Sequence, residues 1–416
     1  MRPSHLVEVH MHDHRSLLTP LTLPCGVTVV NRFLKSAMSE GLAEKDHAPN
    51  GLHQRLYQTF AEGGAGIVVT GNVMVDATAL GEPGNVVLDS DAHLDAFKAW
   101  AKAGTTESSA LWVQLNHPGK QAPRFISKDP VAPSAIRLEG SMRLAFKKPR
   151  ALLDAEIKTL VKKFARSAAL VKDAGFGGVQ IHAAHGYLIS QFLSPKHNQR
   201  SAPYGGSLPN RMRFLMEIYA AMRDAVGPSF PIGVKMNIDD FMKGGFTQED
   251  ALHVMQSLSD NGIDLIELSG GSYENPKMMG QSDQEGFFLA LIEGIKKDLT
   301  APLVITGGFR STNGMASVIT SSTADMIGLA RPLVIDPSIP QKIAEGTFER
   351  VNLPRIKFRF KSLNQRLGPI LGLSAYEVAM RDMAHGRPAR VSSKGGRLLI
   401  QLLWSQGMKA LIRKRR

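Results

Sequence analysis

The sequence predicts a closed (β/α)8 barrel, because eight short apolar segments recur along the chain and a helical pattern follows each of them. Their cores, such as IVV, LVI and DLIEL, are apolar on consecutive residues, as is typical of strands buried on both faces. An open doubly wound sheet with an appended domain is the alternative that this count disfavours. The segments predicted to be strands are Asn31–Ser39, Gly66–Val73, Ala110–His117, Gly177–Ala184, Pro231–Ile238, Gly262–Gly271, Ala301–Phe309 and Asp325–Leu333.

The helical pattern is clearest between the third and fourth of these segments. The stretch Asp154–Asp173 has apolar residues at helical spacing, and Asp154 is its predicted N-cap. Ser207, before a Leu-Pro pair, and Thr247, ahead of two acidic residues, are predicted to begin two further helices. The strand–helix alternation therefore continues through the middle of the chain.

The cysteine count and the apolar runs limit the class of protein. A single cysteine, Cys25, excludes disulfide bonds within the chain and any cluster held by several thiolates, and it agrees with a reducing compartment. The N-terminus lacks the apolar core of a secretory signal, and no apolar run approaches the length of a membrane span. We therefore expect a cytoplasmic protein, with attachment at a membrane surface as the alternative.

The net charge of +13 is unevenly distributed. Residues 341–416 carry 17 Lys and Arg against 4 Asp and Glu, whereas residues 1–340 carry 33 of each. The basic charge thus belongs to a C-terminal segment, and a nucleic-acid-binding surface spread over the fold is not supported.

These observations divide the chain into an N-terminal arm (1–20), a barrel (21–340) and a basic C-terminal helical extension (341–416). Within the extension, Arg397–Ile412 is amphipathic and has basic flanks. This pattern favours either an interfacial helix that binds anionic lipid weakly, or a helix that packs on the barrel or on a partner subunit. A homo-oligomer is compatible with the second interpretation.

Proton-handling side chains follow the fourth predicted strand, in the run HAAHGY. His182, His185 and Tyr187 come directly after the apolar Val-Gln-Ile core of that strand. The carboxyl ends of barrel strands hold the chemistry of this fold. Two imidazoles can donate hydrogen bonds to a carbonyl oxygen, and a tyrosine can act as a general acid. The alternative is a pair of histidines satisfied in a loop with a tyrosine packed at the rim.

Glycine-rich turns end the last two predicted strands. They are Thr306-Gly307-Gly308-Phe309 and Gly328-Leu329-Ala330-Arg331-Pro332. At this place in a barrel, backbone amides and an arginine can bind a terminal phosphate. The glycine clusters at 63–66 and 175–178 precede strands instead of following them, so they are not a dinucleotide fingerprint. The turns indicate a mononucleotide or a sugar phosphate, unless their glycines serve only tight turns.

The chain resembles the Old Yellow Enzyme family of NAD(P)H:flavin oxidoreductases, which are FMN-containing (β/α)8 barrels. The resemblance runs from about Leu21 to about Pro340. It is carried by NRFLKSAMSEG, GGAGIVVTGNV, LWVQLNHPGK, GVQIHAAHGYLISQFLSP, YGGSLPNRMRF and GGF…GLARPL. The blocks QIHAAHGYL…FLSP and YGGS…NR are together specific to this family.

The resemblance implies a role for each matching residue. The residues that would line the flavin ring are Ser36, Ala37, Met38, Ser39, Asn72, Gln114 and Lys235. Those that would form the phosphate site are Gly308, Ala330 and Arg331. Lys235 would lie beside N1 and the O2 carbonyl of the flavin, where a fixed cation favours the reduced state. His182 and His185 would bind the activating group of the substrate, and Tyr187 would donate a proton to the substrate.

The family's activity would make this chain an FMN-dependent ene-reductase. It would take hydride from NADH or NADPH and reduce an activated C=C bond, such as that of an enone. The chain departs from the family in two places. The loop Ser201–Ser207 lacks two acids that the family often carries, and Lys120 stands where an arginine is frequent. With one cysteine, the chain also cannot hold the iron–sulfur cluster of some larger relatives.

Two further interpretations stay open from the residues alone. Lys235 as a Schiff-base lysine would make the protein an aldolase-type barrel. A non-catalytic barrel that binds a flavin or a phosphate is the other. His10, His12 and His14 lack a complete ligand set, so no metal site is predicted.

Overall fold

The computed structural model describes residues 13–275, 285–292, 294–354 and 361–393. Each of the eight predicted strands is present, and together they close into a parallel barrel because the first strand pairs with both the second and the last. In barrel order the strands are β3 (Phe33–Lys35), β4 (Ile67–Met74), β6 (Ala110–Asn116), β9 (Gly178–Ala183), β10 (Ile232–Asn237), β11 (Leu265–Ser269), β12 (Leu303–Thr306) and β13 (Met326–Leu329). The predicted barrel is confirmed.

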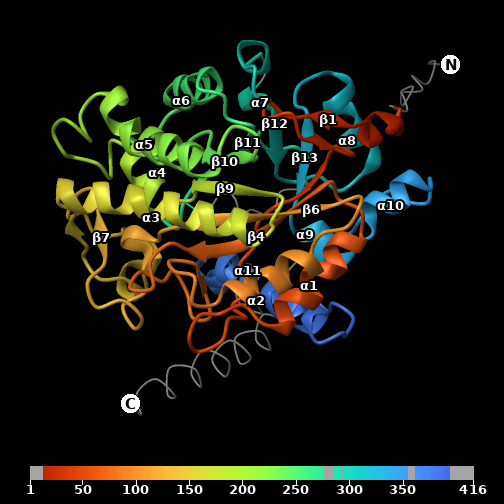
Figure 1. The fold of residues 1–416 in the computed structure, drawn as a ribbon, viewed down its shortest axis with the longest axis horizontal. Helices are drawn as coiled ribbons and strands as arrows, with labels where there is room; N and C mark the ends of the chain where they lie inside the picture. The colour runs from red at the N-terminus through yellow and green to blue at the C-terminus, as the bar shows by residue number, and fades with distance from the viewer. Residues whose placement is uncertain (1–12, 276–284, 293, 355–360, 394–416) are drawn as a thin grey trace.

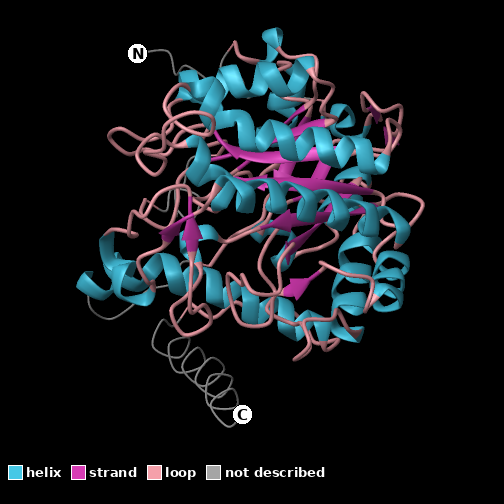
Figure 2. Cartoon of the chain, turned by 60° about the vertical axis from the view of Figure 1, so that its left-hand side comes forward, coloured by secondary structure: helices cyan, strands magenta, loops and turns pink. Residues whose placement is uncertain are grey.

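Helices surround the barrel and cover the outer faces of its strands (Figure 2). They are α1 (Gly51–Glu62), α2 (Leu94–Ala103), α3 (Asp154–Asp173), α4 (Leu188–Leu193), α5 (Leu208–Val226), α6 (Gln248–Asp260), α7 (Leu289–Ile292), α8 (Thr312–Thr320), α9 (Arg331–Ile335), α10 (Ile339–Ala344) and α11 (Lys361–Ala384). Short strands outside the barrel are β1 (Leu21–Thr22), β2 (Thr28–Val29), β5 (Val86–Val87), β7 (Val131–Ala132) and β8 (Arg150–Ala151). Within the described residues, no helix is both long and apolar enough to cross a membrane.

The predicted helix starts are confirmed except for one cap. Thr247 accepts a hydrogen bond from the Asp250 amide, and Ser207 occupies the N-cap position of α5. The prediction of Asp154 as N-cap is wrong, because Asp154 is the first helical residue and Leu153 holds the cap position. The carboxylate of Glu156, in the first turn of α3, accepts the Leu153 amide at 2.7 Å and takes over the capping role.

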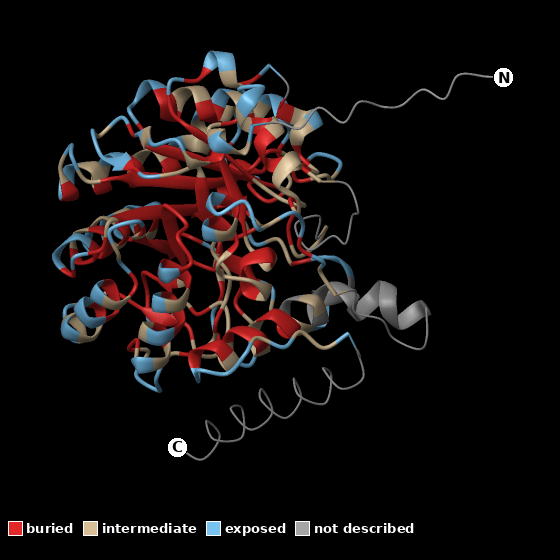
Figure 3. Cartoon of the chain, turned by 90° about the vertical axis from the view of Figure 1, so that its right-hand side faces the viewer, coloured by how far each residue is buried: buried red, intermediate tan, exposed pale blue. Residues whose placement is uncertain are grey.

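The barrel interior is apolar at the amino ends of the strands. Trp112 fills this end. Its indole ring fits because residue 178 is a glycine, since a Cβ atom there would lie 2.5 Å from the ring. Leu23 and Val29, beside the β1–β2 hairpin, belong to the same buried cluster, so the hairpin closes this end of the barrel. The buried strands form the centre of the molecule, and the exposed residues lie on the outer helices and loops (Figure 3). Only the carboxyl ends are left to hold a ligand.

Helix α11 comes from the segment predicted to be an extension, and it packs beside α1 (Figure 1). Its described side chains Tyr376, Ala379 and Met380 are buried. The boundaries of the arm, the barrel and the extension stay a prediction. The amphipathic segment Arg397–Ile412, as well as His10 and His12, lies outside the described residues.

A buried carboxylate fastens the closed end of the barrel. Asp264 accepts hydrogen bonds from the backbone amides of Cys25 and Ile232, each at 2.7 Å, and pairs with Arg223 at 2.6 Å. It therefore ties the β1–β2 hairpin, β10 and α5 together. Removal of the carboxylate would leave a partly buried guanidinium and two amide groups without their acceptor.

We expect Asp264→Ala to lower the unfolding free energy by about 3–5 kcal/mol, because one partner of a buried pair remains uncompensated. The measurement is the apparent midpoint of unfolding in urea. Lys98→Ala, which breaks an exposed ion pair with Asp95 on α2, is the control and should change stability by no more than about 0.5 kcal/mol. Equal midpoints for the two variants would contradict the assignment.

Candidate functional site

A cavity of about 220 Å³ lies at the carboxyl ends of the barrel strands. Every site residue predicted from the sequence lines it, apart from Gly308. The lining residues that were predicted are Ser36, Ala37, Met38, Ser39, Asn72, Gln114, His182, His185, Tyr187, Lys235, Ala330 and Arg331. The fold thus brings together residues that are almost 300 positions apart in the chain.

Gly308 is in the turn after β12 with a φ of 84°, and it does not line the cavity. Its neighbours Thr306 and Arg310 do. Its role at a phosphate stays a prediction.

A carboxylate in the barrel interior organises the floor of the cavity. Glu267 on β11 is fully buried, and its Oε1 atom lies 2.9 Å from the Lys235 ammonium of β10. The same oxygen accepts hydrogen bonds from the hydroxyls of Ser36 at 2.5 Å and Thr306 at 2.7 Å. Lys235 also donates to Ser36 at 2.7 Å. A buried ion pair with this many hydrogen bonds is held in one arrangement.

Two glutamines continue this network across the barrel. The Gln180 amide of β9 donates to Glu267 at 2.8 Å, and its carbonyl accepts from Gln114 of β6 at 2.6 Å. Because the Gln114 amide nitrogen donates to Gln180, the network fixes how the Gln114 amide is oriented at the cavity. The sequence analysis missed Glu267 and Gln180, although an acid within the apolar run DLIEL was a visible signal of a buried polar site.

The charge of Glu267 follows from its neighbours. Burial by itself raises the pKa of this carboxyl, but the attraction of Lys235 and the hydrogen bonds from Ser36 and Thr306 bring the pKa below its ordinary value. Glu267 is therefore ionised at neutral pH. The Lys235 nitrogen is engaged by the Glu267 carboxylate and the Ser36 hydroxyl, whereas a Schiff-base lysine has to present a free amine to the carbonyl.

The two histidines are neutral hydrogen-bond donors. Burial, followed by the nearby positive charges, lowers the pKa of His182 well below its ordinary value and the pKa of His185 to about 3. The Ala184 amide donates to His182 Nδ1 at 3.2 Å, so Nε2 carries the proton. The His185 Nε2 atom lies 2.8 Å from the Ser269 hydroxyl. The rings lie edge to face with their centroids 5.1 Å apart.

Tyr187 packs against the first of these rings, with the centroids of Tyr187 and His182 4.8 Å apart. Its hydroxyl is 3.0 Å from that of Tyr273, and it accepts a long hydrogen bond of 3.5 Å from Asn72. Burial is the main cause that raises the pKa of Tyr187 well above its ordinary value. Tyr187 therefore keeps its proton at neutral pH.

The sequence analysis also missed lining residues outside the motifs. They are Glu82, Ser269, Tyr273, Arg310, Leu353, Pro354, Gly372, Tyr376 and Glu377. Tyr376 and Glu377 belong to α11, so a helix beyond the barrel repeat forms part of the wall. No motif marks this helix, because its contribution depends on how it crosses the barrel mouth.

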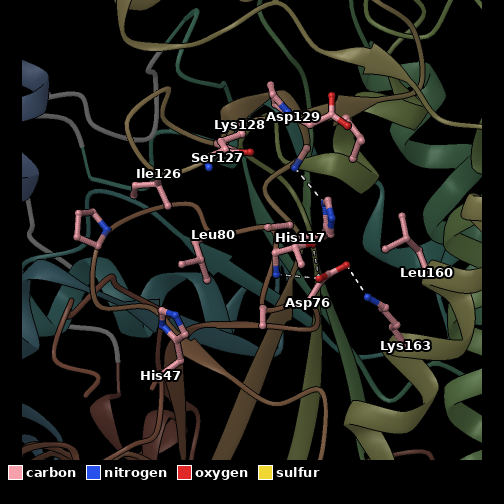
Figure 4. A pocket seen from close by; sticks show the side chains of 18 of the residues that line it. His47, Asp76, Leu80, His117, Ile126, Ser127, Lys128, Asp129, Leu160 and Lys163 are labelled. Carbon is pink, nitrogen blue, oxygen red and sulfur yellow. Dashed lines mark hydrogen bonds and ion pairs between the residues drawn. The ribbon is translucent and has the colours of Figure 1, made fainter. Parts of the chain in front are cut away.

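A second and larger cavity, of about 1410 Å³, lies between α3 and the loops after β4 and β6 (Figure 4). His117, directly after β6, lines this cavity and not the one that contains Tyr187. Its ring lies near the ion pair of Asp76 with Lys163, which spans 2.6 Å (Figure 4). Burial lowers the pKa of His117 to about 4.

A model of the NADH:flavin oxidoreductase / NADH oxidase family matches residues 16–349. The chain belongs to this family. The NADH-dependent flavin oxidoreductase iliE of Hypocrea jecorina (strain QM6a) is 38% identical over 359 residues, which cover 79% of this chain and 88% of the relative. The resemblance to Old Yellow Enzymes inferred from the motifs is confirmed.

Solved structures agree with this assignment. An old yellow enzyme homologue from Zymomonas mobilis superposes with a TM-score of 0.70 and 25% identity, covering 81% of this chain and 94% of that one. A 2-naphthoyl-CoA reductase complexed with 2-naphthoyl-CoA has a TM-score of 0.76 and 26% identity over 80% of this chain. The match covers 52% of that reductase, so this chain spans about half its length. The protein is an FMN-dependent oxidoreductase of the Old Yellow Enzyme type that uses NADH or NADPH.

The buried histidines of this flavin oxidoreductase predict how its stability depends on pH. The ordinary pKa of His117 is 6.5 and its folded pKa is about 4, so the unfolded chain binds the proton first as the pH falls. Stability should therefore decrease between pH 6.5 and 4, by up to about 1.4 kcal/mol per pH unit for each such histidine. His117→Asn keeps an acceptor for the Gly119 amide and should make this decrease shallower.

The measurement is the urea midpoint of each variant at a series of pH values. His253→Asn, on the exposed face of α6, is the matched control and should keep the slope of the parent protein. A His117→Asn slope equal to that of the parent would contradict the buried neutral state of His117.

Proposed function

We propose that the protein reduces the C=C bond of an electron-poor alkene, such as an enone, with Tyr187 as the proton donor and with His182 and His185 binding the activating group. The observation that carries the proposal is the juxtaposition of a protonated phenol with two neutral imidazoles in one cavity. A site that only bound flavin would not require an acid opposite a pair of hydrogen-bond donors.

The donor set of the cavity fits FMN. The Oδ1 atom of Asn72 is buried and has no hydrogen-bond partner among the described residues, so an acceptor is left for a ligand N–H. Gln114 and Lys235 would hold the pyrimidine side of the ring, where an amide and a cation suit its carbonyl oxygens. Arg331 would hold the phosphate, because a guanidinium forks to phosphate oxygens. Bound FMN supplies the two-electron transfer from the nicotinamide to the alkene.

The histidine pair stabilises charge on the substrate. Negative charge develops on the carbonyl oxygen of an enone when its β-carbon accepts hydride. Because Nδ1 of His182 accepts the Ala184 amide, its Nε2 carries the proton and can donate a hydrogen bond to that oxygen. His185 can donate from its second ring position. Two donors fixed in advance cost little reorganisation during the reaction.

Tyr187 completes the reduction at the α-carbon. The hydroxyl is held at the cavity wall by contacts with Tyr273 and Asn72 and is protonated at neutral pH. The Schiff-base alternative for Lys235 is disfavoured by its ion pair with Glu267. The binding-module alternative is disfavoured by the placement of Tyr187 beside the histidines.

The proposal is tested by a two-step titration of the purified protein. Anaerobic NADH or NADPH should bleach the flavin absorption, and the addition of cyclohexenone should restore it. If the flavin stays bleached with a range of enones and returns only with oxygen, the alkene is not the substrate class.

Tyr187→Phe should slow reoxidation of the flavin by cyclohexenone by about 100-fold or more, because a positioned general acid contributes roughly that factor. Reduction of the flavin by NADH should keep its rate, and so should reoxidation by ferricyanide, which needs no proton on carbon. Stopped-flow absorbance measures all three rates. A cyclohexenone rate equal to that of the parent protein would remove Tyr187 from the mechanism.

A further inference from the structure

The geometry points to Tyr273 as a positioning residue for Tyr187: its hydroxyl shares, through a hydrogen bond, the negative charge left on the Tyr187 oxygen after proton donation. The inference rests on the proposed role of Tyr187 as the donor. It goes further by assigning a function to a residue that no motif of the chain marks.

The contact between the two hydroxyls is direct. Their oxygens are 3.0 Å apart, and the rings meet edge to face with centroids 6.0 Å apart. The Asn72 amide nitrogen, 3.5 Å from the Tyr187 oxygen, can only donate. If Tyr273 donates as well, both lone pairs of the Tyr187 oxygen are occupied, and its own proton is left to point toward a substrate.

Backbone contacts bring the two tyrosines together, although they follow strands that are not neighbours. Tyr187 comes after β9 and Tyr273 after β11, with β10 between them. Asn237, at the end of β10, accepts the His185 amide at 3.1 Å and donates to the Gly271 carbonyl at 3.0 Å. The backbones of His185 and Ser272 also pair as an isolated parallel β-bridge. The side chain of Asn237 therefore joins the two loops.

The close approach of the loops depends on Gly186. A Cβ atom on this residue would lie 2.9 Å from Ser272 and 2.8 Å from the Gln121 amide oxygen. Its φ of 76° is also in the left-handed region that favours glycine. Any other residue here would push the loop that carries Tyr273 away from Tyr187.

A buried charge cluster holds the residue after Tyr273. The Glu274 carboxylate lies 3.3 Å from the Lys120 ammonium and 3.0 Å from His197 Nε2, and it accepts the Glu139 amide at 2.6 Å. Lys120 and His197 are themselves 3.1 Å apart. Burial raises the pKa of Glu274, but His197 and Lys120 together bring it down to about 2. This fixed anion keeps Tyr273 from swinging away from its partner.

The chemical need for such a partner follows from burial. When Tyr187 protonates the α-carbon, its O–H bond breaks, the new C–H bond forms and the electron pair stays on the phenol oxygen. A phenolate in a buried site is costly unless hydrogen-bond donors face it. Tyr273 and Asn72 supply them, and the hydrogen bond between the tyrosines spreads the charge over two oxygens. Water then returns the proton to the pair.

Tyr273→Phe is the test, because it removes the hydroxyl and keeps the ring that packs on Phe146. Reoxidation of the flavin by cyclohexenone should slow by about tenfold, because a hydrogen bond to a charged group contributes roughly that factor. Flavin reduction by NADH and reoxidation by ferricyanide should keep their rates. The solvent deuterium isotope effect on the cyclohexenone step should increase, since proton delivery becomes the slower event.

Two further variants separate this role from a structural one. Tyr219→Phe removes a partly buried hydroxyl that donates to the Asn261 carbonyl at the far end of the barrel. This variant should change none of these rates. The double variant Tyr187→Phe with Tyr273→Phe should be no slower than Tyr187→Phe alone, because Tyr273 acts only through Tyr187.

Three results would overturn the inference: an unchanged cyclohexenone rate in Tyr273→Phe, a parallel loss of the ferricyanide rate, or multiplying losses in the double variant. If Tyr187→Phe itself reduces cyclohexenone normally, the proposed donor role fails, and that result is distinct from a failure of Tyr273 alone.

Discussion

The buried carboxylate of Glu267 is the constraint on which the site depends. A charge in the interior of a barrel is tolerated only when it is paired and hydrogen-bonded, and Glu267 obtains its partners from β9, β10, β12 and the end of β3. These partners must lie at one height along the barrel axis, which fixes the floor of the cavity. The Lys235 side chain is thereby held in place, and Gln114 is oriented through Gln180.

Above this floor, the loops decide where the acid and the donors lie. His185 has a φ of 60°, a conformation that is uncommon for residues other than glycine, and Gly186 follows with 76°. The two consecutive left-handed residues turn the chain sharply, so that His182, His185 and Tyr187 all reach the cavity within six positions. Such strain persists only where surrounding contacts enforce it, and the hydrogen bond from the His185 amide to Asn237 is one of them.

The wall opposite the barrel comes from outside the eightfold repeat. Tyr376 and Glu377 of α11 and the segment at Leu353 and Pro354 line the cavity together with the flavin-side residues. Glu82 faces the same space, and burial followed by repulsion from Glu377 raises its pKa to about 8. Substrate selection by this enzyme should therefore depend on parts of the chain that the common barrel framework does not dictate.

The sequence by itself determined the barrel, the family and most of the cavity, because consecutive apolar residues and motif spacing are local signals that burial imposes directly. It placed His182, His185 and Tyr187 at the end of a strand, where the chemistry of a barrel is held, and the family resemblance added Lys235. Only the tertiary structure decided that Glu267 is the counter-ion of Lys235, that His117 faces a different cavity, and that Tyr273 meets Tyr187. These contacts join residues far apart in the chain, and their geometry is set by strand register and loop conformation, which no local pattern encodes.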